Sequence, residues 1–119
     1  MLLKKIFTFD AAHHLTKYHG KCERPHGHTY KLVVTLEGEP DGEDMVYDFV
    51  KLKKLVHELV LDHYDHADLN DLFENPTAEN IAVAIYNTLA PAVATDLVRL
   101  HEIEVWETAT SGVVYGGQR

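Results

Sequence analysis

The segment HGHTYKLVVTLE, residues 26–37, decides the fold expected for this chain. Apolar side chains recur in it at every second position: Tyr30, Leu32, Val34 and Leu36. Side chains at i and i+2 of a strand point to the same face, so the pattern predicts a strand over residues 28–37. His26 and His28 continue the alternation, and an unbroken strand would carry both imidazoles on its apolar face. Two imidazoles held in this way can bind one transition-metal ion.

A third histidine precedes this strand in the segment FDAAHH, residues 9–14. Residues 2–9 also alternate like a strand, and their pattern favours His13 over His14 as a third ligand, because His13 continues the face of Phe7, Phe9 and Ala11. Three neutral imidazoles form a compact site for zinc (Zn²⁺) and leave one coordination position open for chemistry. The alternative is chance, since the chain contains nine histidines.

The rest of the chain is patterned as turns, helices and strands. Residues 39–42 have the composition of a turn, and residues 45–47 could begin a returning strand. Asp48 is a suitable N-cap for a helix whose apolar residues recur at helical spacing: Leu52, Leu55, Val56, Leu59 and Val60. Thr77 caps a second predicted helix, which Pro91 should end or kink. Residues 98–108 and 112–117 are the last two predicted strands.

This order, β-β-α-α-β-β, predicts the α+β class: a four-stranded antiparallel sheet with two helices on one face, in one domain spanning residues 1–119. A sheet this small has unprotected edges. Closing a barrel between subunits is one way to remove them, so a homo-oligomer is plausible.

Composition excludes several classes of protein. The net charge is −8 and the longest basic run is Lys53-Lys54, which argues against a nucleic-acid-binding protein. No apolar stretch reaches the length of about 20 residues that spans a membrane, and the first residues do not resemble a secretory signal. A single cysteine allows no intrachain disulfide, so we expect a cytoplasmic protein.

The single cysteine, Cys22, lies four residues before His26. A thiolate beside a cation has a lowered pKa and can act as a base or a nucleophile. Two other interpretations remain open at this point. Cys22 could complete a closed structural zinc site as its fourth ligand, or it could be an inert buried thiol.

Two acidic positions could also carry chemistry. Asp65-His66 could form a carboxylate–imidazole relay, although Asp62-His63 is an equally good pair, and a solvated acidic helix end explains most such runs. Glu107 shares a predicted strand face with apolar residues. Its carboxylate could accept paired hydrogen bonds from the N–H edge of a guanine-like or pterin-like ring, or it could be an exposed residue at a strand end.

Taken together, these motifs resemble the 6-pyruvoyltetrahydropterin synthase / 6-carboxytetrahydropterin synthase family over essentially the whole chain. Each motif alone is weak, and their combination is highly specific. The matching stretches are FDAAH at 9–13, CERPHGH at 22–28, Asp65-His66 with Leu69-Asn70-Asp71, NPTAEN at 75–80, and Glu107-Thr108.

The resemblance implies a role for each candidate residue. It places zinc on His13, His26 and His28. It makes Cys22 the general base, and it favours Asp65-His66 over Asp62-His63 as the assisting pair. It makes Glu107 the pterin anchor. It also implies the tunnelling fold (T-fold), in which three subunits close a twelve-stranded barrel, two trimers stack into a hexamer, and active sites lie between subunits.

Within the family, the spacing Cys-x-x-x-His-Gly-His is similar to that of the bacterial 6-carboxytetrahydropterin synthases of queuosine (7-deazapurine) biosynthesis. The implied substrate is the small molecule 7,8-dihydroneopterin triphosphate. Pyruvoyl-forming relatives usually have a longer gap between the cysteine and the histidines. A folate-pathway branch uses a glutamate in place of the cysteine, and Glu23 keeps that branch open. The non-enzymatic alternative is a zinc-stabilised binding module with Cys22 as a ligand.

Overall fold

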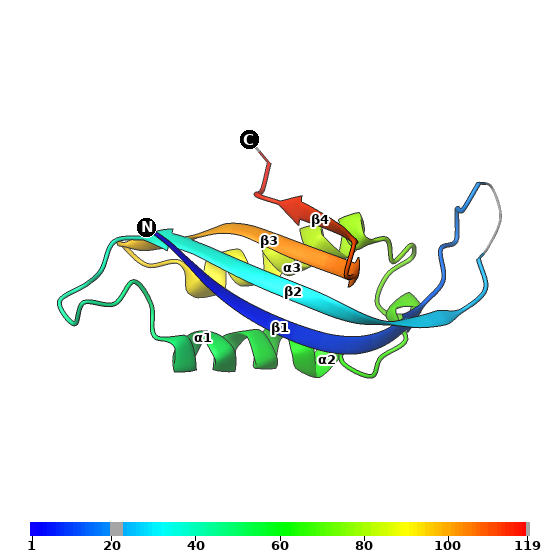
Figure 1. Ribbon diagram of the computed structural model, residues 1–119, viewed down its shortest axis with the longest axis horizontal. Helices are drawn as coiled ribbons and strands as arrows, with labels where there is room; N and C mark the ends of the chain where they lie inside the picture. Colours follow the sequence, from blue (N-terminus) through cyan, green and yellow to red (C-terminus); the bar gives the residue numbers. More distant parts are fainter. Residues whose placement is uncertain (20–22, 119) are drawn as a thin grey trace.

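The computed structural model describes residues 1–19 and 23–118, which form a four-stranded antiparallel sheet in the order β1-β2-β3-β4 (Figure 1). Each strand pairs with the next one along the chain. The predicted sheet is therefore confirmed. Its strands are β1 (Leu2–His13), β2 (His26–Gly38), β3 (Val98–Thr108) and β4 (Ser111–Tyr115).

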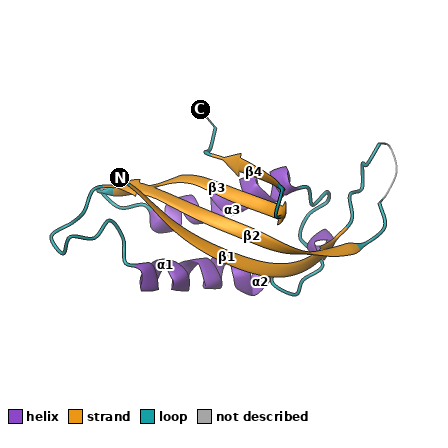
Figure 2. Cartoon of the chain, in the orientation of Figure 1, coloured by secondary structure: helices purple, strands orange, loops and turns teal. Residues whose placement is uncertain are grey.

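The helices between β2 and β3 pack on one face of the sheet (Figure 2). The first is a continuous helical stretch built from α1 (Phe49–Val56), a π-helical segment (His57–Leu61) and α2 (Asp62–Tyr64). A 3-10 turn (Leu69–Asp71) and α3 (Ala78–Val93) follow. The predicted caps are present, because Asp48 accepts a hydrogen bond from the Val50 N–H and Thr77 accepts one from the Asn80 N–H. None of the helices in the described ranges is long and apolar enough to cross a membrane.

The core lies between the helices and the alternating face of the sheet that the sequence predicted. Phe9 of β1 stacks on Tyr30 of β2, with ring centroids 4.9 Å apart. This packing continues along both strands, so the face that ends in the histidines is the face that packs on the helices. The core residues with almost no exposed surface include Phe9, Tyr30, Leu32, Val34, Leu36, Leu52, Ile81, Ile85, Leu89 and Ile103.

Two local predictions need correction. Residues 45–47 do not form a strand. The Asp41 side chain accepts hydrogen bonds from the backbone N–H groups of Glu43 and Met45, which closes a compact loop and lets Val46 and Tyr47 bury their side chains without strand pairing. Pro91 lies inside α3 and does not end it, because the helix continues for two residues beyond the proline.

Two irregularities interrupt the alternation of β3. Glu102 pairs with Thr35 and Leu100 pairs with Leu36, so His101 is an extra residue in the ladder with β2. The register with β4 likewise shifts between Trp106 and Thr108, which leaves Glu107 as the extra residue there. A β-bulge of this kind bends the strand and redirects a side chain, and bulges are frequent beside active sites.

The packing of Gly112 in β4 against Trp106 in β3 leads to a testable prediction. A methyl group on Gly112 would overlap the indole ring of Trp106, coming within 2.6 Å of Cε3. We therefore expect Gly112→Ala to lower the free energy of unfolding by about 1–3 kcal/mol. It should also change the fluorescence of Trp106, the only tryptophan in the chain. Urea unfolding followed by fluorescence measures both effects.

Gly42→Ala is the matched control, because a methyl group there has no neighbour within 4 Å. Equal stability of the two variants would contradict the packing described for Trp106.

Candidate metal centre

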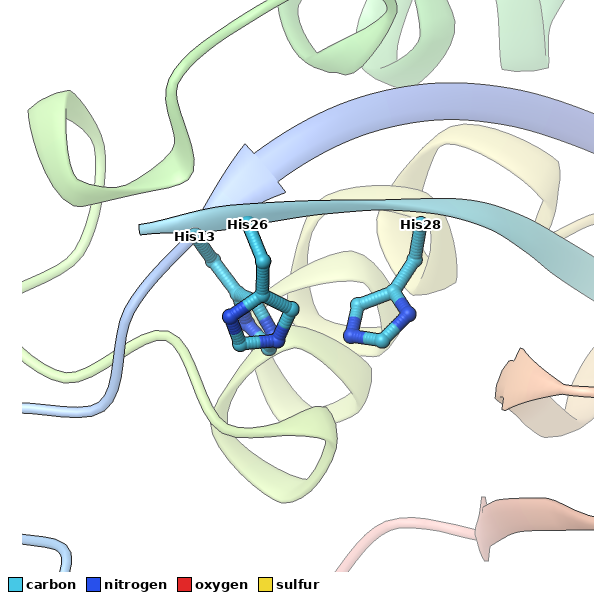
Figure 3. A group of neighbouring side chains, drawn as sticks. All are labelled: His13, His26 and His28. Atoms are coloured by element: carbon cyan, nitrogen blue, oxygen red, sulfur yellow. The ribbon is translucent and has the colours of Figure 1, made fainter. Parts of the chain in front are cut away.

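Three histidines converge where β1 ends and β2 begins (Figure 3). The register of the two strands places His13 opposite His26 and Ala11 opposite His28, so the three imidazoles project from one face. Their ring centroids lie 4.7 Å apart for His13–His26, 4.9 Å for His13–His28 and 4.7 Å for His26–His28. One ring nitrogen from each lies within 4.8 Å of the others, so the group could hold a metal ion.

Hydrogen bonds determine which nitrogens are free to bind a metal. The Nδ1–H of His13 donates to the carbonyl oxygen of Pro76 at 2.9 Å, and the Nδ1–H of His26 donates to that of Arg24 at 3.0 Å. A carbonyl oxygen can only accept, so in both rings the proton sits on Nδ1 and the lone pair sits on Nε2.

The two Nε2 atoms lie 3.1 Å apart. Two lone pairs at this distance repel each other unless a cation lies between them. Tetrahedral zinc, with Zn–N bonds of about 2.0–2.1 Å, would place its ligand nitrogens about 3.3 Å apart. The three imidazole donors, and the separation of the His13 and His26 nitrogens, therefore fit a zinc ion.

The electrostatics of the cluster also suit metal binding. His13 is buried, whereas the side chain of His26 is 38% exposed, so the centre is closed on one side and open on the other. Burial lowers the pKa of His28, and the neighbouring His13 lowers this pKa further. A lowered pKa favours the neutral imidazole, which is the form that binds metals.

The competing candidate, His14, lies outside the cluster. Its ring Nε2 is 3.3 Å from Nδ2 of Asn70. Cys22 lies outside the residues that the structure describes, so its role remains a prediction from the sequence.

The side chains of Asp65 and His66 are in contact. Nδ1 of His66 lies 3.1 Å from Oδ2 of Asp65, and Oδ1 of Asp65 accepts a hydrogen bond of 2.9 Å from the Asp10 N–H. This backbone hydrogen bond lowers the pKa of Asp65 and keeps the carboxylate charged. His66 adopts a left-handed backbone with φ of 61°, and its N–H donates to the Asp10 carbonyl oxygen. Asp62 and His63, the alternative pair, are exposed in α2.

The structure does not bring this pair together with the three histidines on one face. Asp10 and Thr29 are paired across the strands, and the Thr29 hydroxyl donates to the Asp10 carboxylate. By strand alternation both project away from the face that carries His13. The His66 ring lies beside Asp10, and His66 borders a pocket of about 440 Å³ that Thr29 and His28 also line.

Glu107, the bulge residue of β3, is half-buried, and its charge acts on His28 of the cluster. Its negative charge opposes the lowering of the His28 pKa. Burial raises the pKa of Tyr30, which lies beneath the histidines, and the charge of Glu107 raises it further. Glu107 also lines a pocket of about 280 Å³ together with Thr77 and Ser111. The sequence identified Thr77 only as a helix cap, because the fold alone brings it to this pocket.

Comparisons with known proteins agree with this fold. The family model for 6-pyruvoyl tetrahydropterin synthase matches residues 2–118. The chain is 39% identical to the 6-carboxy-5,6,7,8-tetrahydropterin synthase of Synechocystis sp., with 99% of this chain and 95% of the relative covered. It is 41% identical to the dihydroneopterin monophosphate aldolase of Pyrococcus furiosus, with 89% of each covered.

The solved structure of Caenorhabditis elegans 6-pyruvoyl tetrahydropterin synthase is similar to this chain, with a TM-score of 0.85, 32% identity and coverage of 99% of this chain and 96% of the other. The fold and its histidine cluster thus define a T-fold protein with a candidate metal centre. The chain belongs to the 6-pyruvoyl tetrahydropterin synthase family, and the resemblance seen in the sequence is confirmed.

The metal centre can be tested by removing its ligands. Changing His13, His26 or His28 to alanine should abolish tight zinc binding, because two imidazoles leave the ion without a stable protein site. Zinc retained after extensive dialysis, measured by atomic absorption, checks this expectation. His63→Ala, which removes an exposed histidine, should retain zinc as the wild type does. Unchanged zinc content in the three ligand variants would refute the site.

Proposed function

We propose that this chain is a zinc-dependent lyase that acts on 7,8-dihydroneopterin triphosphate. With one water consumed, the products would be 6-carboxy-5,6,7,8-tetrahydropterin, acetaldehyde and triphosphate, in queuosine biosynthesis. The observation that carries the proposal is the convergence of three imidazoles, with the Nε2 atoms of His13 and His26 3.1 Å apart and the charge of Glu107 acting on His28. The Synechocystis relative of this name supports it.

Each proposed residue has a chemical task. When bound, zinc would act as a Lewis acid toward the hydroxyl groups of the substrate side chain. Glu107 would accept hydrogen bonds from the N–H edge of the pterin and hold the reacting carbons in place, which can lower a barrier by several kcal/mol. Cys22 would move the proton beside the reacting carbon, and Asp65-His66 would serve as the second acid/base group.

We further propose that one subunit supplies the histidines and a neighbour supplies Asp65-His66. The proposal rests on the position of this pair beside Asp10 and Thr29, on the face opposite the histidines. Strands β1 and β4 are both sheet edges, and Ile6 of β1 is 61% exposed. Pairing these edges among three subunits would close a barrel, and two such trimers would stack into a homohexamer.

Product identification is the decisive experiment. Zinc-loaded protein incubated with 7,8-dihydroneopterin triphosphate should release acetaldehyde and a carboxytetrahydropterin, both identified by mass spectrometry. A hydroxymethylpterin would instead indicate side-chain cleavage of the aldolase type, the second candidate, which the Pyrococcus furiosus relative favours. A pyruvoylpterin would indicate the third activity in the family. Absence of any product would favour a zinc-stabilised binding module.

The role of Cys22 leads to a separate prediction. Cys22→Ala should retain zinc while its turnover falls by about 10²–10⁴-fold, the usual contribution of a general acid or base. Zinc content and acetaldehyde release are measured on the same preparation. Loss of zinc in this variant would show that Cys22 is a ligand. Cobalt substitution gives a second test, because thiolate ligation produces strong charge-transfer absorption.

A further inference from the structure

The chain that leaves β1 is held on one side by side chains of residues 70–75, and on the other by Glu23, which pairs with both backbone polar groups of Leu15. The side-chain oxygen Oδ1 of Asn70 accepts a hydrogen bond from the His14 N–H at 2.9 Å. Its Nδ2 donates to the His14 carbonyl oxygen at 3.0 Å. One amide side chain therefore satisfies both backbone polar groups of the residue that directly follows His13.

A second asparagine makes one such contact, to the backbone two residues further along. Oδ1 of Asn75 accepts a hydrogen bond from the Thr16 N–H at 3.1 Å. The carbonyl oxygen of Asn75 accepts one from the Asn80 side chain in α3 at 2.9 Å. This contact ties the segment to a long, well-packed helix.

These contacts matter because His13 is the last residue of β1. Its pairing with His26 is the final pair of the β1–β2 ladder. Strand ends open locally at low free-energy cost unless other contacts hold them. A metal centre, in contrast, needs its ligands held within about 0.5 Å of the binding geometry. The hydrogen bond from His13 to Pro76 orients the ring, but it leaves the main chain beyond His13 to be fixed by other groups.

We propose that Asn70 and Asn75 are positioning residues of the metal centre. By pairing with the main chain at His14 and Thr16, they hold His13 at the point where its Nε2 meets that of His26. Neither asparagine binds the ion. This role accounts for two motifs, Leu69-Asn70-Asp71 and NPTAEN, that the proposed chemistry leaves mostly unused. The inference rests on the proposed metal binding and is independent of the reaction catalysed.

The test compares zinc affinities of Asn70→Ala, Asn75→Ala and a control, measured by competition with a chromophoric chelator. The control is Thr95→Ala, which removes a hydroxyl that accepts hydrogen bonds from Leu97 and Val98 in the connection between α3 and β3, away from the histidines. Removing the supporting contacts of metal ligands usually weakens binding by 10–100-fold. We expect at least a tenfold loss for Asn70→Ala, a smaller loss for Asn75→Ala, and less than twofold for Thr95→Ala.

The cobalt(II) absorption spectrum provides a readout that a general loss of stability would not change. Altered ligand-field bands in Asn70→Ala, with an unaltered spectrum in Thr95→Ala, support the positioning role. Zinc affinities and spectra of both asparagine variants equal to those of Thr95→Ala would overturn it. Should Asn70→Ala fail to fold, Asn75→Ala becomes the test: a threefold or greater loss of zinc affinity supports the positioning role, and a smaller loss overturns it. Wild-type protein that binds no zinc would overturn the metal centre itself and this inference with it.

Discussion

The antiparallel pairing of β1 with β2 is the constraint on which the candidate site depends. A slip of one residue would turn every side chain of β1 to the opposite face and separate His13 from His26 and His28. The slip is prevented by apolar packing on the same face, where Phe9 stacks on Tyr30 and Leu32 is fully buried. Each such side chain contributes about 1.5–3 kcal/mol. The packing of the core therefore sets the register of the two strands, and with it the geometry of the metal centre.

Much of this arrangement could be predicted from the sequence, because alternation and capping are local signals. The parity of residues 26–36, the position of His13 beside His26 and His28, and the caps Asp48 and Thr77 all agree with the structure. Residues 45–47 were predicted wrongly because a short apolar run looks the same in a strand and in a buried loop. The bulge at Glu107 could not be predicted, since the pairing strand rather than the local sequence determines an extra residue.

The position of Asp65-His66 shows a different limit of sequence reasoning. The adjacency of the two residues indicates a possible relay, but it does not indicate the face on which the relay lies. That face is set by hydrogen bonds to the main chain of Asp10 and by the left-handed backbone of His66. Histidine is one of the residue types that tolerate this conformation. The pair thus lies beside Asp10, whose side chain projects from the face of the sheet opposite to the one that carries the three imidazoles.

The same segment of chain supports both parts of the proposed active site. Residues 66–75 run alongside residues 10–16, and the contacts in order are His66 with Asp10, Ala67 with Ala12, Asn70 with His14, and Asn75 with Thr16. A displacement of this segment would therefore shift the acid/base pair and loosen His13 together. If neighbouring subunits share their sites as proposed, each segment supports the metal ligand of one site and the acid/base pair of the next. A shift of the segment would then affect two neighbouring sites at once, through hydrogen bonds to the backbone within a single protomer.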